Sequence, residues 1–230
     1  IRDLRMARGL GDVYKRQEYV MTILPSMLSG LKMTAGVFIL TIIGALPLGV
    51  IVSMALRSEI YLLRWLTNGY IWIMRGTPLL LQIVFVYYGL SLAHIATFPR
   101  FEAAIFTFIL NYAAYFAEIF RGGLQSVPQG QYDGAKVLGL SQFQTMRKIV
   151  LPQVAKIVMP SVGNEVVNLV KDTSLVYVIG LADLMRAGNI AASRDVTLVP
   201  YLMVGVLYLV LTIFATVIMR RVETNLNYYK

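Results

Sequence analysis

Residues 126–152, SVPQGQYDGAKVLGLSQFQTMRKIVLP, form a polar segment between two long apolar stretches and predict two short helices in a loop. Ser126 followed three residues later by Gln129 matches a capping box, and Pro128 falls in the first turn that such a box would open. Gly139 stands where a helix could end in a left-handed residue. We therefore expect the first helix to begin near Ser126 and to end before Gly139.

A second capping box, Ser141 with Gln144, predicts a second helix that runs toward Pro152. Basic side chains occur along the segment at Lys136, Arg147 and Lys148. A loop that keeps two helices is typical of a docking element. An ordinary amphipathic connector explains the local pattern equally well, so both interpretations stay open on these signals.

The composition indicates a membrane protein. Hydrophobic residues make up 57% of the 230 residues, charged residues make up 14%, and the mean hydropathy is +0.66. A soluble domain of this size does not need so much apolar surface, so the bilayer is the expected solvent. The chain has no cysteine, which excludes disulfides and cysteine metal sites, and we assign no role to its one histidine, His94. The net charge of +9 fits loops at a membrane surface better than it fits nucleic-acid binding.

The first 17 residues, IRDLRMARGLGDVYKRQ, differ from the rest of the chain. Their five basic and two acidic residues supply +3 of the net charge, and they contain no apolar run of signal-peptide length. The run DVYKRQ at 12–17 is similar to one reading frame of a transposon end used in sequencing adaptors. We expect residues 1–17 to be a non-native tail that precedes a transmembrane domain at 18–230; a native basic arm is the alternative.

Five apolar runs are long enough to cross a bilayer, since a membrane-spanning helix needs about 20 residues. They are Leu31–Leu56, Leu66–Ala93, Phe101–Phe120, Ile157–Leu181 and Leu198–Met219. Arg75 and the helix-breaking turn Gly76-Thr77-Pro78 interrupt the second run. The expected fold class is all-α: a polytopic membrane protein with five transmembrane helices.

The distribution of Lys and Arg predicts the orientation in the membrane. The regions after the first, third and fifth runs hold ten basic residues: Arg57, Arg64, Arg121, Lys136, Arg147, Lys148, Lys156, Arg220, Arg221 and Lys230. The opposite side holds four outside the tail: Lys32, Arg100, Arg186 and Arg194. The positive-inside rule therefore places the C-terminus and the segment 126–152 in the cytoplasm and the N-terminus outside.

The fourth run holds the most polar side chains, with Glu165, Asn168, Lys171 and Asp172 at helical spacing. Ionisable groups inside a membrane are costly, and they usually face a bundle interior or a wet cavity. One interpretation is internal pairing that neutralises Lys171. The other is a polar site on a substrate pathway.

Such a polar site suits a zwitterion, because a carboxylate in low-dielectric surroundings attracts an ammonium group. Asp172 is our first choice for that carboxylate, with Thr173 and Ser174 as its hydrogen-bond partners. A cation or a helix N-terminus would take the carboxylate of the substrate.

Two further ionisable residues are placed on the expected pathway, Arg75 and Glu118. Glu118 is either a second acidic group of the site or a residue at the cytoplasmic rim near Arg121. Arg75, beside the break at Gly76, either helps to hold a gate or extends its charged end to the interface.

The chain contains no recognisable source of energy. It has no G-x-x-x-x-G-K-[ST] phosphate cradle, no His/Cys cluster of metal spacing and no Ser/His/Asp set, so neither a metal site nor catalytic residues are expected. Five spans are also few for a secondary transporter built from inverted repeats. A transporter of this size would be one half of a dimer that another protein powers.

Four motifs stand out: RGTPLL at 75–80, NYAAYFAEIFRGG at 111–123, KDTSL at 171–175, and DGA at 133–135 followed by Gly139 and IVLP at 149–152. Together they resemble the motifs of the membrane permease subunits of polar amino-acid ABC importers, of the histidine, glutamine and glutamate permease type. The last motif is similar to the cytoplasmic ABC permease loop, which here would run from 122 to 156. The resemblance covers the chain from about residue 18 to its end.

The resemblance implies the type I (MetI-like) permease fold and a place in the bacterial plasma membrane, where the chain would form the pathway for a polar amino acid. It implies a second permease, identical or paralogous, two ATPase subunits that bind ATP and Mg²⁺, and an external amino-acid-binding protein. No cofactor and no enzymatic activity are expected in this chain. The resemblance implies ATPase coupling for Asp133, Gly134, Ala135, Gly139, Ile149, Leu151 and Pro152.

Two positions depart from the family pattern, because Asp133 and Gly134 stand where the family has Glu and Ala. Aspartate keeps the charge on a shorter arm, whereas glycine lowers helix stability by roughly 1 kcal/mol relative to alanine. The likeness favours glutamine or glutamate as the substrate. A stand-alone channel or sensor subunit with the same fold is the alternative function.

Overall fold

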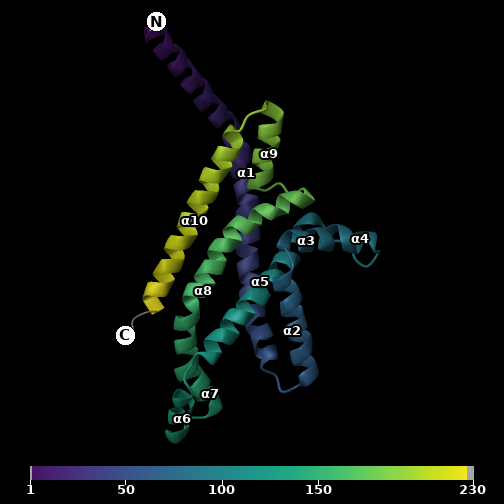
Figure 1. The fold of residues 1–230 in the computed structure, drawn as a ribbon, viewed down its shortest axis with the longest axis vertical. Coiled ribbons are helices and arrows are strands. Elements are labelled where there is room, and N and C mark those ends of the chain that lie inside the picture. The colour runs from purple at the N-terminus through teal and green to yellow at the C-terminus, as the bar shows by residue number, and fades with distance from the viewer. Residues whose placement is uncertain (1, 227–230) are drawn as a thin grey trace.

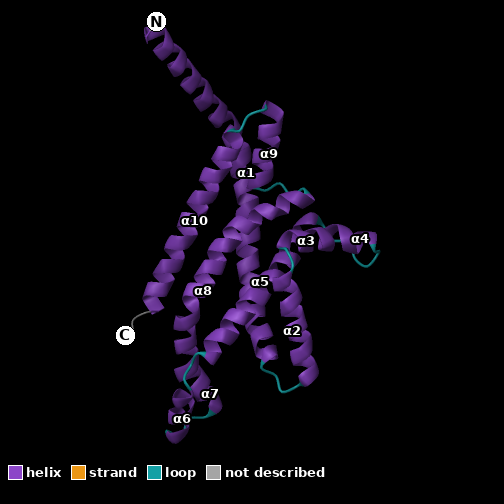
Figure 2. Ribbon diagram, in the orientation of Figure 1, coloured by secondary structure: helices purple, strands orange, loops and turns teal. Residues whose placement is uncertain are grey.

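The computed structural model describes the backbone of residues 2–226 and the side chains of residues 17–226. Within these bounds the chain is helical, with short loops between the helices (Figures 1 and 2). The longer helices are α1 (Arg2–Leu56), α2 (Tyr61–Gly76), α5 (Arg100–Gln125), α8 (Leu151–Asp172) and α10 (Val199–Leu226). The shorter elements are α3 (Leu79–Val84), η1 (Phe85–Gly89), α4 (Leu90–Leu92), α6 (Gln129–Val137), α7 (Gln142–Thr145), η2 (Met146–Val150), η3 (Thr173–Ile179) and α9 (Leu184–Asp195).

The membrane-crossing elements agree with the five predicted spans. Three helices are long and apolar enough to cross a bilayer alone: the part Gln17–Leu56 of α1, then α5 and α10. Two bent pairs complete the set when each is counted as one span. The first joins α2 to Leu79–Leu92 at 107°, and the second joins Gln142–Ile179 to α9 at 56°. The all-α membrane fold is therefore confirmed for the described residues.

The helices run mainly along the long axis of the molecule (Figure 1). α1 and α10 descend from the end that carries the N-terminus, and α8 lies beside α10 and rises from the opposite end. α6 and α7 lie at this opposite end, toward which the C-terminal end of α10 also points. The two ends of the described backbone, Arg2 and Leu226, thus lie toward opposite ends of the bundle, as an odd number of spans requires.

The core forms where α1 packs against α5, which is the most extensive contact between two helices. Phe108, Tyr112 and Phe116 of α5 are fully buried there. Glycine allows the close approach of α1, because a Cβ added at Gly49 would lie 2.7 Å from the Phe116 Cβ. Small residues at helix contacts are the usual means of close packing inside a membrane.

The backbone of residues 2–17 continues α1. The side chains of residues 2–16, residue 1 and residues 227–230 lie outside the described part. The expectation that residues 1–17 are a non-native tail therefore stays a prediction.

The first helix of the segment 126–152 begins later than predicted. Pro128, not Ser126, is the N-cap of α6, and it provides no side-chain cap. The Ser126 hydroxyl instead donates to the Gly122 carbonyl and closes the end of α5. The capping-box prediction at Ser126 is thus wrong, because the hydroxyl serves the helix that ends there.

The turn between α6 and α7 agrees with the sequence. Gly139 has φ of +72°, as the left-handed helix end requires. The Gly139 and Leu140 amides donate to the Lys136 and Ala135 carbonyls in a Schellman arrangement. Because both carbonyls would otherwise lack partners, this turn fixes where α6 ends.

The second helix begins as predicted but does not end at Pro152. Ser141 and Gln144 form a reciprocal capping box, with both side chain-to-backbone bonds present. The chain then stays helical through α7, η2 and α8 to Asp172. Pro152 lies inside this continuous stretch, directly after the π-helical turn η2, and it lacks the amide that would donate to the preceding turn. The helical stretch that contains the predicted fourth span therefore begins at Gln142, inside the segment 126–152.

The helix α9 was not predicted from the sequence. It follows a loop in which Gly180 has φ of +78°, and it starts at Asp183, whose carboxylate accepts hydrogen bonds from the Met185 and Arg186 amides. Asp183 is fully buried, so this N-cap also ties the loop to the bundle.

Candidate functional site: a polar cavity inside the helix bundle

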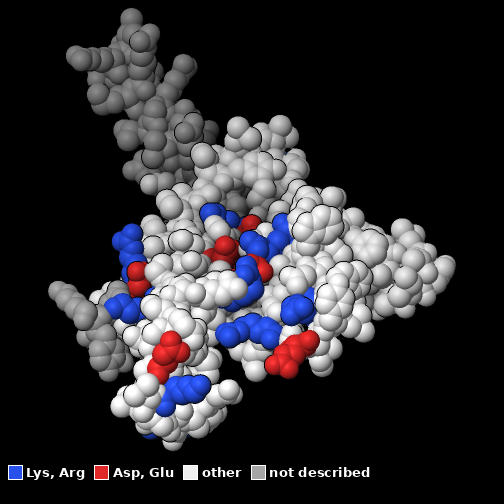
Figure 3. All heavy atoms as spheres, turned by 60° about the horizontal axis from the view of Figure 1, so that its bottom comes forward, with Lys and Arg blue, Asp and Glu red and all other residues white. Residues whose placement is uncertain are grey.

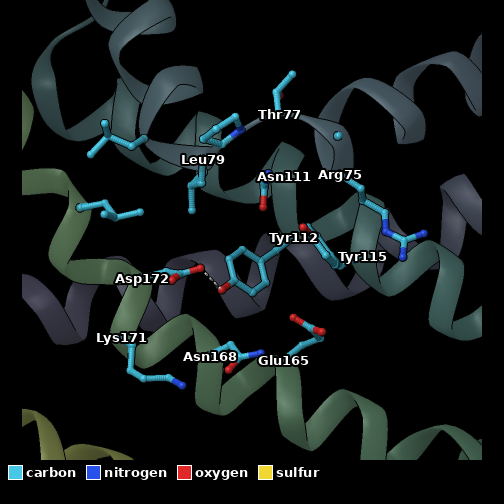
Figure 4. A pocket seen from close by; sticks show the side chains of 14 residues that line it. Arg75, Thr77, Leu79, Asn111, Tyr112, Tyr115, Glu165, Asn168, Lys171 and Asp172 are labelled. Atoms are coloured by element: carbon cyan, nitrogen blue, oxygen red, sulfur yellow. Dashed lines mark hydrogen bonds between the residues drawn. The ribbon is translucent and has the colours of Figure 1, made fainter.

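A cavity of about 760 Å³ lies where the break between α2 and α3 faces α5 and α8 (Figure 4). Most of the polar residues predicted for the substrate pathway meet there. Its lining consists of Arg75, Gly76, Thr77, Pro78, Leu79, Leu80, Asn111, Tyr112, Tyr115, Glu165, Asn168, Lys171, Asp172 and Leu175. Side chains distant in the sequence thus form one hollow among the membrane-spanning helices.

Asp172 is half-buried at the end of α8 and faces Tyr112 across the cavity. The Tyr112 hydroxyl donates to the Asp172 Oδ2 at 2.8 Å, as Figure 4 shows. The rest of the Tyr112 ring is buried between Phe108 and Phe116, so the hydroxyl is held in place by packing. The carboxylate therefore has one fixed donor and an open side toward the cavity.

Glu165 and Asn168 lie on the same face of α8 as Asp172, two turns and one turn before it (Figure 4). Both side chains point toward the cavity, and Glu165 is half-buried. Lys171 extends away from Asp172 and is exposed. No ion pair joins Lys171 to Glu165 or to Asp172 among the described residues. The internal pairing considered for this helix is thus not the arrangement observed.

Arg75 is held at the edge of the cavity by two contacts. Its guanidinium lies 3.6 Å from the Glu118 Oε2 and 5.3 Å from the centre of the Tyr115 ring. Glu118 in turn accepts two hydrogen bonds from Arg121, at 2.6 and 3.1 Å. Glu118 therefore holds the side chains of both Arg75 and Arg121 in place, and it does not line the cavity itself.

Thr173 and Ser174, predicted as partners of Asp172, do not line this cavity. The Thr173 hydroxyl is buried and donates to the Val170 carbonyl. The helix tightens from α to 3₁₀ after Asp172, so the next two side chains point elsewhere. The predicted contact of Thr173 and Ser174 with Asp172 is therefore not formed, and a role of either residue in transport stays a prediction.

Two amide side chains, Gln82 and Asn111, hold the break at Gly76–Pro78, and neither was predicted to have a role. The Gln82 amide donates to the Met74 and Thr77 carbonyls and to the Thr77 hydroxyl, at 2.8 to 3.2 Å. The buried Asn111 amide donates to the Met74 carbonyl and to the Gln82 Oε1, both at 3.0 Å. These bonds satisfy the backbone that the break exposes inside the membrane.

The sequence does contain a signal for Gln82 and Asn111, because each is a polar residue inside an apolar run. Tyr112 gave no such signal, because an aromatic residue in a span usually packs in the core. The orientation of its hydroxyl toward Asp172 follows only from the packing of α5 against α8.

The expected coupling residues lie together at the far end of the bundle, on and beside α6 and α7 (Figure 1). Ala135 is buried, whereas Asp133, Gly134, Gly139, Leu151 and Pro152 are exposed and Ile149 is partly buried. Three apolar side chains project from this region: Val137, Leu138 and Phe143 are 87%, 76% and 71% exposed. Figure 3, with this end turned forward, shows basic and acidic side chains intermingled over the same face.

The chain matches the family of binding-protein-dependent transport system inner membrane components over residues 45–228. It belongs to this family. The match includes the break at Gly76–Pro78, the cavity and the segment 126–152, so the site described above lies inside the family domain.

Relatives of this permease are amino-acid transport proteins. It is 35% identical to the arginine transport system permease protein ArtQ of Bacillus subtilis (strain 168), over 89% of this chain and 94% of that protein. It is 34% identical to the glutamine transport system permease protein GlnP of Escherichia coli (strain K12), over 89% and 94%. The chain is thus a membrane-spanning permease subunit of a polar amino-acid ABC importer, as its motifs predicted.

Solved structures confirm the fold of the permease. An amino acid ABC transporter crystallised with histidines is 32% identical, with a TM-score of 0.84 over 90% of this chain and 97% of that one. The methionine ABC transporter MetNI in an inward-facing conformation matches with a TM-score of 0.70 at 17% identity, over 91% and 98%, which supports the MetI-like fold alone.

Proposed function

We propose that the polar cavity is the site at which this permease holds a neutral polar amino acid, of the glutamine class, during transport. The observation that carries the proposal is the pairing of an open carboxylate, Asp172, with the arginine held at the opposite edge, Arg75. The two groups match the ammonium and the carboxylate of a zwitterion.

The charge of the lining favours a substrate without net charge. Two cations, Arg75 and Lys171, and two carboxylates, Glu165 and Asp172, contribute to the lining, and they sum to zero. A cationic amino acid would leave one charge uncompensated in a site surrounded by membrane helices. The polar amides of Asn111 and Asn168 suit a side chain such as that of glutamine.

We further propose that α6 and α7 couple the permease to an ATPase subunit. An exposed apolar tip of Val137, Leu138 and Phe143 is unfavourable in water, and burial against a partner removes that cost. The segment 126–152 would then lie in the cytoplasm with the C-terminus, as the excess of Lys and Arg at that side also favours. The N-terminus would lie outside.

The complete importer would contain two permeases, identical or paralogous, two ATPase subunits that bind ATP and Mg²⁺, and an external amino-acid-binding protein. The permease itself would supply the pathway in the bacterial plasma membrane, and ATP hydrolysis would occur in the separate ATPase. Glu118 would act on the pathway through Arg75, which it holds at the edge of the cavity, and Thr173 and Ser174 remain part of the proposed pathway.

Substitution of Asp172 tests the substrate site. In membrane vesicles that hold the whole importer, we expect Asp172→Asn to lower uptake of radiolabelled glutamine by about tenfold or more, since a hydrogen bond to a charged group contributes about 1.5–3 kcal/mol. Glu102→Gln is the matched control, because it makes the same change at an exposed site away from the cavity. Uptake by Asp172→Asn equal to that of the control would refute the site, and faster uptake of arginine than of glutamine would refute the substrate class.

Substitution of Val137 tests the coupling. Val137→Asp places a charge on the exposed tip, and we expect the ATPase to be lost on co-purification while membrane insertion persists. Val196→Asp is the control, because Val196 is 91% exposed directly after α9, a helix that lies far from α6 and α7 in Figure 1. Retention of the ATPase by Val137→Asp would contradict the docking role.

A further inference from the structure

Two arginines that do not line the polar cavity meet at the loop between η3 and α9. Arg100 is the first residue of α5, and Arg186 lies in the first turn of α9. A Cβ placed on Gly180 would lie 3.4 Å from the Arg186 Nη1 and 3.7 Å from the Arg100 Cζ. Because both atoms lie this close to one point, they are no more than about 7 Å apart, a distance at which like charges repel. We call Arg100 and Arg186 the arginine pair.

Gly180 makes this arrangement possible. It ends η3 with φ of +78°, a conformation that residues with a Cβ rarely adopt. A side chain on this residue would also contact both guanidinium groups. The glycine therefore lets cations from two different helices approach the same point of the backbone.

No salt bridge neutralises the arginine pair within the described part of the chain. The Arg100 Nε donates to the Tyr87 hydroxyl at 3.2 Å, which is a bond to a neutral group. Arg186 interacts electrostatically with the Asp183 carboxylate, but that carboxylate is fully buried and already caps α9. Glu102, in the first turn of α5, is exposed and lies beyond salt-bridge distance of both arginines. The pair therefore carries more positive charge than its surroundings balance.

The arginine pair is accessible from outside the bundle. Arg100 is exposed and Arg186 is half-buried. Arg186 also borders a hollow of about 390 Å³ between α1 and α9. The other cation of that hollow, Arg194, forms a salt bridge of 2.7 Å with Asp195, so its charge is balanced. α9 lies far from α6 and α7 (Figure 1), so the orientation proposed above places the pair on the external side.

The chemistry of the pair favours a carboxylate. A guanidinium group offers parallel N–H donors that match the two oxygens of a carboxylate, and a carboxylate between two such groups would remove their repulsion. A free zwitterionic amino acid also brings an ammonium group, which the pair would repel. An acidic side chain of a protein brings negative charge alone, so charge complementarity favours a protein partner.

We propose that the arginine pair is the point at which an acidic side chain of the external amino-acid-binding protein docks on this permease. The inference rests on the proposed function, which supplies this partner and the orientation of the chain. It adds the permease residues that receive the partner and the charge that the partner must present. The docking point also lies at the end of η3, and the other end of η3 follows Asp172 of the polar cavity directly.

Surface plasmon resonance tests the proposal, with the whole importer immobilised in nanodiscs and the amino-acid-binding protein encoded beside it as the probe. We expect Arg100→Gln/Arg186→Gln to weaken its binding about tenfold or more, since hydrogen bonds to charged groups are lost. Arg57→Gln/Arg64→Gln is the matched control, because it removes the same charge from two exposed sites in the region after α1, which the proposed orientation places on the cytoplasmic side. Its affinity should equal that of the unaltered importer.

A second measurement does not depend on the folding of a variant. For the unaltered importer, a rise in NaCl from about 0.05 M to about 0.3 M should weaken docking severalfold, because salt screens an exposed charge pair. Docking that salt does not weaken, or equal affinity of the double variant and its control, would overturn the proposal. Weaker binding of labelled glutamine by the double variant without the binding protein would overturn it as well, since the pair would then hold the substrate itself.

This inference and the proposed substrate site fail separately. Undiminished docking by Arg100→Gln/Arg186→Gln overturns the docking point and leaves the polar cavity untouched. Undiminished uptake by Asp172→Asn refutes the substrate site and leaves the docking measurement as it was.

Discussion

Asn111→Leu is expected to loosen the break between α2 and α3 without changing the size of the side chain much. The variant loses two hydrogen bonds of 3.0 Å, to the Met74 carbonyl and to the Gln82 Oε1. Hydrogen bonds between membrane helices contribute about 0.6 kcal/mol on average and up to about 1.7, so two of them amount to about 1–3 kcal/mol. The Met74 carbonyl keeps its hydrogen bond from the Gln82 amide. The loss of stability is therefore smaller than the cost of leaving a buried backbone carbonyl without any hydrogen bond.

Thermal unfolding of the purified permease in detergent measures this loss. A change of about 1–3 kcal/mol corresponds to a lower Tm by about 2–10 °C in a chain of this length. Asn164→Leu is the matched control, because Asn164 is exposed on α8 and its side chain forms no hydrogen bond with the other described residues. We expect its Tm to be unchanged or higher. A Tm for Asn111→Leu that matches the control would refute the role given to the network around the break.

Three further changes test other contacts. Gly30→Ala should lower the Tm, because the new Cβ would lie 2.7 Å from the Asp183 carbonyl oxygen and 2.8 Å from its carbon, at a cost of about 1–3 kcal/mol, whereas Gly36→Ala meets nothing within 4 Å and should not. Asp183→Ala should cost about 1–2 kcal/mol of stability through the lost cap of α9, and Asp183→Asn should restore most of it; equal losses would contradict the capping role. Tyr112→Phe should tighten binding of labelled glutamine to the purified permease about 2- to 10-fold, because the ammonium no longer competes with the hydroxyl for Asp172; unchanged or weaker binding would count against that competition.

Local chemistry explains which parts of the fold the sequence predicts. Long apolar runs predict α1, α5 and α10, and the turn at Gly76–Pro78 predicts the break, since both depend on residues close in sequence. The same holds for the turn at Gly139 and the capping box at Ser141. α9 could not be predicted in this way, because it is short and its charged residues lie among small ones, so it forms no long apolar run.

The cavity could not be predicted from the sequence alone, because its lining is brought together only by the tertiary structure. Glu165, Asn168 and Asp172 could be grouped by helical spacing alone, and they do line it together. Helical spacing could not exclude Thr173 from the cavity lining. The helix changes from α to 3₁₀ geometry after Asp172, and this change turns the Thr173 side chain to another face. Tyr112 became visible only when the packing of α5 against α8 brought its hydroxyl to the carboxylate.

The helical path from Gln142 to Asp172 gives the two ends of the permease a direct mechanical link. It has no non-helical residue, although a π-helical turn and Pro160 interrupt its regularity, and it extends over about 45 Å. One end starts beside the exposed tip of α6 and α7, and the other carries Asp172. If this rod tilts by about 10° about its loop end, simple geometry moves the Asp172 end by about 8 Å, which exceeds the reach of any hydrogen bond in the cavity. Such a tilt would separate Asp172 from Tyr112, so under the proposed coupling the rod would act as a lever that turns a small motion at the loop into release of a ligand.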